Sequence, residues 1–583
     1  MMYMNIAVRG KGIICAIGNN TSEVLDSLRK GQSGIAEMRY LQSEHKELPV
    51  GEVKLSDGEM KLMLGLDAST IVSRTTLMGA IAIRQALADA AVETEGKRVS
   101  VISGTTVGGM DVTERYFLQI REAGQGDTIL NLLDKHDCGS STREMADIAG
   151  LKDAEVCTIS TACSSAVNSI ILGAEMLKRG EVDIVIAGGS EALSKFHLNG
   201  FNTLMILDHE QCRPFDSTRA GLNLGEGAAF VVMEKGEGPV LVSGYGNRCD
   251  AFHQTASSDN GEGAYLAMTD ALKMANLAPA DIQYINAHGT GTPNNDKSES
   301  AGIRRVFGDS LPLISSTKGL TGHTTSASGS IETVICMLAM EHDFVPGNYG
   351  WNSQDADCIT PSLGEKNIQL DNVVCNSFGF GGNDSSIIIS KKPNPGASDV
   401  QAEEFGVKEI ACQMIDDVEQ LKDFREFISP MEARRMGKLM KAAMLTSLRA
   451  LKEAGLECPD AIITATANGM LETSEKFLVD MCDNGEELLK PTLFMQSTHN
   501  TLSSAIAIRL KCHGYNVTYT QGAESFEWAL RDARRLIETG KAKSVLVGCH
   551  DESTELFQAF CEKAGKKAAP MIYSKSVVLS RAD

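Results

Sequence analysis

Short apolar runs alternate with amphipathic stretches along most of the chain. The apolar runs are rich in Val and Ile and are bounded by Gly, which is typical of strands buried on both faces of a helix-covered parallel sheet. The stretches between them have the period of a helix. In the first part of the chain the strand-like runs are 4–18, 98–106, 155–160 and 182–189, and the helical stretches are 21–31, which begins with a capping Thr, and 83–92. This alternation predicts an α/β fold.

The same alternation continues to about residue 390 and then stops. Residues 391–404 combine Pro, Gly, Ser and charged residues, which indicates a linker. The later helices are expected at 264–276 and about 326–341, and the later strands at 282–290, 311–316 and 372–379. We therefore predict a first half at 1–245, a second half at 246–392, a linker at 393–404 and a third unit at 405–583.

The third unit repeats part of the first half. Like residues recur at a constant spacing of 360 positions, as between residues 74 and 434. Nothing in the third unit resembles 265–390, so the copy is a half. The matching pairs are Arg74 and Arg434, Gly109 and Gly469, Met110 and Met470, Gly180 and Gly540, and Gly188 and Gly548.

Composition excludes several classes of protein. An apolar content of 43% is enough for buried cores, and a net charge of −21 argues against a nucleic-acid or anionic-membrane surface. The first residues have no signal-peptide pattern, and no run is long and apolar enough to span a membrane. The 15 cysteines include no CxxC pair or zinc spacing. A reduced cytoplasmic compartment fits best, with most cysteines, Cys157 among them, acting as small buried hydrophobes.

Cys163 is different because it lies where a strand gives way to a helix. The apolar stripe of that helix begins at Val167, so the thiol is expected near a helix N-terminus, where N–H groups and the dipole favour a thiolate. Small residues surround it and leave room for a substrate. These features are typical of a nucleophile elbow, although a buried structural cysteine is the alternative.

Two histidines strengthen the case for a nucleophile. His288 and His323 each lie in a turn of Gly, Thr and Ser that follows a strand, where an imidazole can move a proton or donate to a thioester oxygen. Lys318 and Glu332 flank His323 and form either a surface pair or a buried pair that fixes the loop. Phe380, in a third glycine turn, either packs in the core or gates the pocket and offers its N–H.

Four motifs in this order resemble the β-ketoacyl-acyl carrier protein synthases of the thiolase superfamily. They are TACSSA (161–166), NAHGTGTP (286–293), KGLTGH (318–323) and NSFGFGG (376–382). The segments at 10–20, 72–79 and 213–229 support the match, which covers about 1–392. The resemblance is to the elongating condensing enzymes with a Cys-His-His site. It implies two pseudo-symmetric five-layered α-β-α-β-α halves, to which the third unit adds another thiolase-like half.

The resemblance also implies the chemistry. Cys163 is expected to take an acyl chain as a thioester, and His288 and His323 to hold a malonyl thioester as it loses CO₂. The backbone N–H groups of Cys163 and Phe380 resemble the oxyanion hole of the family. Lys318 and Glu332 resemble its supporting pair. Thr290 and Thr292 are expected to contact substrate, and no metal is expected.

The expected reaction is a decarboxylating Claisen condensation that gives a 3-oxoacyl-acyl carrier protein, without a cofactor. Its substrates are phosphopantetheine thioesters on acyl carrier protein, in a polyketide-like, aryl-polyene-like or fatty acid pathway. A homodimer is expected, and Arg74 and Arg213 are candidates for docking the carrier protein. The alternatives are a housekeeping fatty acid elongation enzyme and, in a different class, a non-catalytic scaffold or chain-length-setting subunit.

The third unit resembles a catalytically empty, chain-length-factor-like half-ketosynthase. Ala523 stands where the repeat would place the cysteine, and it cannot form a thioester. No loop like those of His288 and His323 follows it. The sequence therefore predicts an inactive partner fused to an active enzyme.

Overall fold

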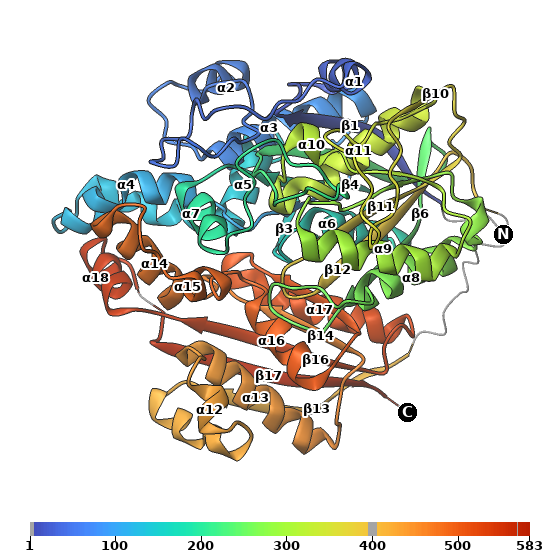
Figure 1. Ribbon diagram of the computed structural model, residues 1–583. Helices are drawn as coiled ribbons and strands as arrows, with labels where there is room; N and C mark the ends of the chain where they lie inside the picture. The colour runs from blue at the N-terminus through green and yellow to red at the C-terminus, as the bar shows by residue number, and fades with distance from the viewer. Residues whose placement is uncertain (1–4, 395–404, 568, 583) are drawn as a thin grey trace.

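A computed structural model describes residues 5–394, 405–567 and 569–582 (Figure 1). Of the linker predicted at 393–404, only residues 393 and 394 are among them. Within the described part of the chain, no helix has both the length and the apolar character needed to cross a bilayer.

The first half is built from five strands and the helices between them. Its elements are β1 (Ile6–Cys15), α1 (Thr21–Lys30), α2 (Asp57–Leu64), α3 (Arg74–Ala90), β2 (Val99–Gly104), α4 (Met110–Glu122), η1 (Thr128–Lys135), α5 (Cys138–Ile148), β3 (Glu155–Ile159), α6 (Ser165–Arg179), β4 (Ile184–Glu191), α7 (Lys195–Thr203) and β5 (Gly227–Lys235).

The second half follows directly. Its elements are β6 (Val240–Cys249), α8 (Glu262–Ala275), η2 (Pro279–Asp281), β7 (Tyr284–Asn286), α9 (Pro293–Phe307), β8 (Leu313–Ser315), α10 (Lys318–Thr321), η3 (Thr325–Ala327), α11 (Ser328–Glu341), β9 (Phe344–Val345), β10 (Glu365–Lys366), β11 (Asn372–Gly379) and β12 (Asn383–Ser390). The boundary predicted at residue 245 falls within β6, which belongs to the second half from its first residue.

The third unit, called the tail below, begins after the linker. Its elements are β13 (Val407–Ile415), η4 (Val418–Glu426), α12 (Pro430–Ala433), α13 (Lys438–Ala454), β14 (Ala461–Ala465), α14 (Leu471–Asn484), α15 (Pro491–Met495), α16 (Thr501–Leu510), β15 (Tyr515–Tyr519), η5 (Gly522–Glu524), α17 (Ser525–Glu538), β16 (Ser544–Glu552), α18 (Glu555–Lys563) and β17 (Ile572–Arg581).

The two halves form the five layers that the resemblance implies. Helices α3 and α5 cover the outer face of the strands of the first half, and α8 and α9 lie on the outer side of the strands of the second half. These strands belong to one continuous sheet, in which β1 pairs with β6. Helices α6 and α11 lie between the strands of the two halves and contact both sets, so they are buried along almost their whole length. The strand–helix–strand order therefore places the residues that follow β3, β7 and β11 around one central layer.

The sheet is mixed, so the expectation of a parallel sheet was only partly right. Strands β3, β2 and β4 run parallel, as do β11, β7 and β8. The pairs β4–β5, β5–β1, β6–β12 and β12–β11 are antiparallel. Antiparallel strands can also be buried on both faces when helices cover them, so an apolar run does not reveal strand direction.

The tail reproduces the sheet of the first half in mirror order. The strands run β13-β17-β16-β14-β15 in the tail and β3-β2-β4-β5-β1 in the first half, joined where β15 pairs antiparallel with β3. Two hydrogen bonds extend this junction, from Ser160 N to Thr518 O and from Thr520 N to Thr158 O, each 3.0 Å long. Equivalent strands thus meet about a pseudo-twofold axis, the self-complementary arrangement of a symmetric dimer.

The junction is part of a continuous core. Ile159 and Val167 of the first half share one hydrophobic cluster with Tyr519 and Trp528 of the tail. Figure 1 shows α14 and α15 of the tail beside α7. Because apolar side chains fill the junction, the tail and the first half form one packed body.

Two local predictions were wrong. Helix α1 is capped by Asn20, whose side chain accepts from Glu23 N, and not by Thr21. Arg434 does not match Arg74 in the structure, since α3 begins at Arg74 whereas α13, also 17 residues long, begins at Lys438. The Gly180 and Gly540 pair does correspond, because each residue follows the central helix of its copy at a φ of 71°.

Candidate active site

Cys163 lies in a tight elbow between β3 and α6. Ala162 has a φ of +51°, a left-handed conformation that is uncommon for a residue with a Cβ. The Ser165 hydroxyl donates to Ala162 O at 2.6 Å and accepts from Thr161 N at 2.9 Å. This clamp holds the turn, and the predicted position of Cys163 just before a helix is confirmed.

The structure brings the three predicted reactive side chains together. Cys163 Sγ lies 3.1 Å from His323 Nε2, and the ring centroids of His288 and His323 are 5.2 Å apart. One sulfur or nitrogen atom from each of the three residues lies within 4.8 Å of the others. All three are buried, so a substrate in this site meets the thiol and both imidazoles away from bulk water.

Backbone contacts fix the two histidine loops. The carboxylate of Glu299, on α9, accepts from His288 N at 2.9 Å and from Gly289 N at 2.7 Å. His323 N donates to Asn223 O at 2.7 Å, and its Nδ1 lies 3.0 Å from the Ser328 hydroxyl. With Nδ1 engaged by this hydroxyl, Nε2 is the ring nitrogen that faces the thiol.

Lys318 and Glu332 form a buried ion pair, which confirms the second of the two alternatives. Their side chains are 1% and 2% exposed. Lys318 Nζ also donates to His288 O at 2.6 Å and lies 3.4 Å from His288 Nδ1. The pair therefore joins α10 and α11 to the His288 loop and places a positive charge beside the imidazoles.

The pKa shifts correct one expectation. Burial raises the pKa of the Cys163 thiol to about 12, despite the opposing effects of Lys318 and the Phe380 N–H. The resting group is therefore a thiol and not the thiolate that the helix terminus suggested, because desolvation outweighs the dipole. Burial, followed by Lys318, lowers the pKa of both His288 and His323 well below the usual value, so both are neutral.

The structure places both the backbone and the ring of Phe380 near the site, and its role as a gate stays a prediction. Its backbone N–H lowers the pKa of the Cys163 thiol, against the larger effect of burial. Its ring stacks on Phe201 with centroids 5.7 Å apart and packs against the surrounding apolar cluster. The hydroxyls of Thr290 and Thr292 lie 2.9 Å from each other, and their contact with substrate stays a prediction.

Sequence reasoning missed Glu191, a buried carboxylate beside Cys163. It is 1% exposed, and its charge opposes ionisation of the thiol. Donors to it include the hydroxyls of Thr105, Thr106 and Thr325. Its position in the sequence could have revealed it. Glu191 is the last residue of β4, and the carboxyl ends of the parallel strands β2, β3 and β4 lie at the edge of the sheet where Cys163 lies.

The structure does not support Arg74 and Arg213 as residues that dock a carrier protein. Arg74 is buried and pairs with Glu226 and Asp57 at 2.7 and 2.8 Å, so it cannot meet a partner protein. The side chain of Arg213 is only 17% exposed and pairs with acidic neighbours. The sequence around these two arginines gives no indication of burial, which only tertiary packing decides. Cys157 is fully buried, as expected.

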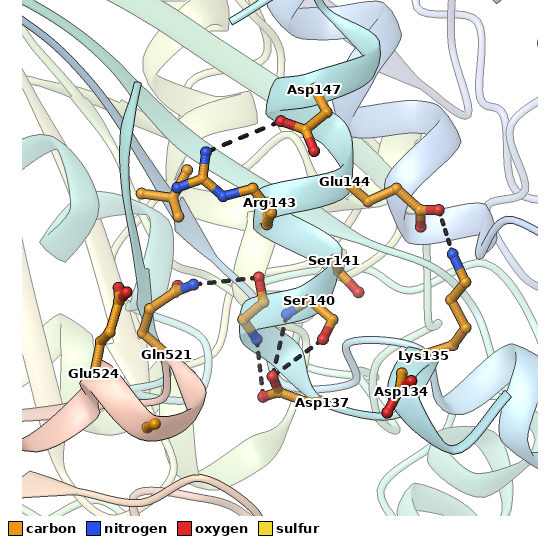
Figure 2. Close-up of a pocket in the computed structure, with 13 residues that line it drawn as sticks. Asp134, Lys135, Asp137, Ser140, Ser141, Arg143, Glu144, Asp147, Gln521 and Glu524 are labelled. Atoms are coloured by element: carbon orange, nitrogen blue, oxygen red, sulfur yellow. Dashed lines mark hydrogen bonds and ion pairs between the residues drawn. The ribbon is translucent and has the colours of Figure 1, made fainter. Parts of the chain in front are cut away.

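The tail keeps the elbow but opens it to solvent. Figure 2 shows Gln521 and Glu524 of the tail facing α5 across a pocket of about 470 Å³ that Ala523 also lines. Ala523 is exposed, whereas Cys163 is 6% exposed. In the part of the chain that the structure describes, no histidine lines this pocket, and the elbow at Ala523 is not covered as the elbow at Cys163 is.

Comparison with family models divides the chain as the repeat does. Residues 4–238 match the N-terminal domain of beta-ketoacyl synthase, and 240–352 match the C-terminal domain. Residues 411–583 match an N-terminal domain of the same kind a second time. A 3-oxoacyl-[acyl-carrier-protein] synthase 2 from Coxiella burnetii is 30% identical over 415 residues, covering 67% of this chain and 99% of that protein.

Solved structures of ketosynthases with chain length factors are also similar to this chain. The ishigamide ketosynthase/chain length factor is similar with a TM-score of 0.61 and 29% identity, over 66% of this chain and 99% of that one. The PfaC keto synthase-chain length factor has a TM-score of 0.77 over 99% of this chain and 78% of its own, at 15% identity. The second likeness shows that the fold extends through the tail.

Proposed function

This chain belongs to the β-ketoacyl synthase family, and on that premise we propose that it condenses an acyl group on Cys163 with a malonyl thioester on acyl carrier protein. The product is a 3-oxoacyl-acyl carrier protein. The observation that carries the proposal is the buried Cys163–His323 contact of 3.1 Å, with His288 beside it.

Acylation of Cys163 comes first. Because the thiol pKa is about 12 and His323 is neutral, His323 Nε2 takes the proton as the sulfur attacks the acyl thioester. A C–S bond forms, the carrier thiolate leaves, and the proton returns to it. The N–H groups of Cys163 and Phe380 stabilise the oxyanion of the tetrahedral intermediate.

Condensation follows in the same pocket. The malonyl thioester loses CO₂, and the two imidazoles, with His323 now in its Nε2–H tautomer, donate to the enolate oxygen that develops on its carbonyl. The enolate carbon attacks the Cys163 thioester, a C–C bond forms, and the Cys163 thiolate leaves. The thiolate then takes up one proton from solvent, which is the proton that the overall reaction consumes. The positive charge of Lys318 next to His288 favours the enolate over the neutral thioester.

A cavity at the junction bears on the acyl class. It measures about 40 Å³, and its lining is mixed. The polar residues include Thr106, which bonds to Glu191, His136 and His197, and Thr498 and His499 of the tail, and the apolar ones include Val107, Met110 and Phe196. A long alkyl chain placed against the polar residues would shield them from water, which is unfavourable. The polar part of the lining supports a short or oxygenated acyl group, as in polyketide-like synthesis, over elongation of saturated fatty acids.

The proposal also covers the cofactor requirement, the assembly and the cellular location of the enzyme. The enzyme needs no bound cofactor, because the thiol, imidazoles and N–H groups supply every step. The tail occupies the β3 edge within the same chain, so a homodimer would assemble through another surface. Cysteines without disulfide partners among the described residues support a cytoplasmic location.

The test is condensation by the purified chain supplied with malonyl- and acyl-carrier protein. We expect mass spectrometry to show a product longer by two carbons. When the malonyl substrate is left out, we expect an acyl adduct on Cys163. Acetoacetyl-carrier protein should acylate faster than dodecanoyl-carrier protein. Equal condensation by C163A would contradict the proposal, and preference for dodecanoyl would contradict the acyl class alone.

A further inference from the structure

The turn that carries the Phe380 N–H rests directly on the tail. It joins β11 to β12 through Gly381 and Gly382, both at positive φ. A Cβ at Gly381 would lie 2.1 Å from the Ser504 hydroxyl and 3.0 Å from Asn500 Nδ2, both on the tail. The tail therefore packs so closely against this turn that no side chain fits at Gly381.

Asn500 makes the polar part of that contact. Its side-chain Nδ2 donates to Phe380 O at 2.9 Å and to Asn383 Oδ1 at 2.7 Å, so it bridges the two ends of the turn. Asn516, also of the tail, accepts from Asn383 Nδ2 at 3.0 Å. We propose that Asn500 is a positioning residue, through which the catalytically empty tail aims the Phe380 N–H at the oxyanion formed on Cys163.

The position of Asn500 in its own helix supports this assignment. It is the N-cap of α16, where an Asn side chain ordinarily accepts from the first turn of its helix. Its side chain makes no such bond, and among the described residues Oδ1 has no hydrogen-bond partner although Asn500 is 1% exposed. The Asn500 side chain therefore does not cap its own helix, and its buried Oδ1 has no partner among the described residues. Its Nδ2 bonds to the turn of Phe380 instead.

Chemistry fixes the orientation of the amide. Phe380 O can only accept, and Asn383 Oδ1 can only accept. Only the NH₂ group of Asn500 can face both oxygens, because the opposite orientation would place Oδ1 against them. The contact therefore requires a side chain with two donors at this position.

The equivalent residue of the first half behaves in the opposite way. Asp137 is the N-cap of α5 and faces the empty elbow, with Oδ2 3.5 Å from the position of a Cβ on Gly522. Figure 2 shows its carboxylate turned back onto its own helix, where it accepts from Gly139 N at 3.0 Å and Ser140 N at 3.2 Å. Across the same junction, Asn500 of the tail bonds to the turn of Phe380, whereas Asp137 of the first half bonds to its own helix.

The proposal rests on the acyl transfer assigned to Cys163 and predicts which step suffers. Acylation develops an oxyanion next to the Phe380 N–H, whereas decarboxylation develops one beside His288 and His323. Removal of an oxyanion donor slows a reaction by roughly 10²–10³-fold, and a displaced donor by less. Loss of Asn500 should therefore slow acylation selectively.

The experiment compares N500S with the native full chain. Serine keeps a residue able to cap α16 but is too short to reach Phe380 O. We expect single-turnover acylation of Cys163 to fall roughly tenfold, while malonyl decarboxylation, measured with and without N500S in a C163A background, changes less than about twofold. Amide exchange of residues 376–384 should rise in N500S.

The control is T554A, which removes the cap of α18 elsewhere in the tail. It should lower Tm and leave acylation unchanged. Acylation by N500S within twofold of native, or an equal loss of acylation and decarboxylation, would overturn the proposal. If the native chain itself does not acylate, the proposed function fails, and unchanged exchange of 376–384 in N500S would then separately overturn the role of Asn500.

Discussion

The elbow at Cys163 and its copy at Ala523 have almost the same backbone and opposite chemistry. Ala162 has a φ of 51° and Gly522 a φ of 53°. Ser525 clamps the copy as Ser165 clamps the original, accepting from Gln521 N and donating to Gly522 O, each at 2.7 Å. The strand–helix turn is therefore a requirement of the fold.

The surroundings of the two elbows explain why only one has a reaction to perform. Cys163 is buried under the second half, which supplies both histidines and the Phe380 N–H. The copy retains the carboxylate below the elbow, where Asp551 accepts from the Thr466 hydroxyl as Glu191 does from Thr105. In the described structure Ala523 is exposed, whereas Cys163 is buried. The elbow therefore positions a nucleophile, and the opposite half makes that nucleophile reactive.

The largest expected effect comes from exchanging the two residues. C163A should reduce condensation at least about 10³-fold, because no thioester can form. A C163A/A523C double variant should remain as inactive, since none of the described residues that line the pocket at residue 523 is a histidine that could accept the proton of a thiol there. Condensation assays and the acyl mass of the intact protein check both. Acylation at residue 523 would show that the elbow alone suffices.

Among the described residues of the tail, no ion pair is as deeply buried below the elbow as the pair of Lys318 and Glu332 is below Cys163. K318M leaves Glu332 buried without its partner and should lower the free energy of unfolding by about 3–5 kcal/mol. Urea denaturation measures this. The matched control is K476M, which breaks an exposed pair with Glu472 and should change stability by less than about 1 kcal/mol. Equal losses would mean that Lys318 does not stabilise the fold as a buried partner.

The two copies differ at the residue before the carboxylate below each elbow, and this difference affects how stability depends on pH. His550 stands where the first half has Ser190, and burial lowers the pKa of His550 to about 3. The unfolded chain binds a proton near pH 6.5, so stability is lost as pH falls from 6.5 toward 3, by about 1.4 kcal/mol per unit.

H550S should therefore flatten the acid side of the stability curve by about one proton. Unfolding free energies at pH 5, 6 and 8 give the slope. The serine variant is expected to lose some packing at every pH, and only the change in slope tests the histidine. An unaltered slope would mean that His550 is not the group that titrates.

The smallest effect concerns the turn itself. A Cβ at Gly522 would meet only Asp137 Oδ2, at 3.5 Å, so G522A adds backbone strain without a clash. It should lower stability by about 1 kcal/mol, and A162G should raise it by up to about the same amount. Thermal unfolding of the two variants provides the comparison. Changes of the same sign would contradict the equivalence of the turns.

Much of the molecule was predictable from local pattern. The apolar runs located β1, β2, β3, β4 and β11, and the repeat located the tail, because buried strands and a duplicated fold leave regular traces in sequence. Strand direction and the burial of Arg74 were not predictable in this way. Both depend on which element packs against which, and a buried arginine in an ion pair has the same local sequence as an exposed one.

By itself, the sequence determined the elbow, the two histidine loops and the missing sulfur of the copy, since each is a matter of residue type and spacing. Only the tertiary structure decided that the Cys163 thiol is protonated, because desolvation depends on all the layers around it. It also decided that Asn500 lies against the turn of Phe380, 120 residues away. The pairing of strands β3 and β15 brings Asn500 to this turn. No local sequence pattern predicts that pairing.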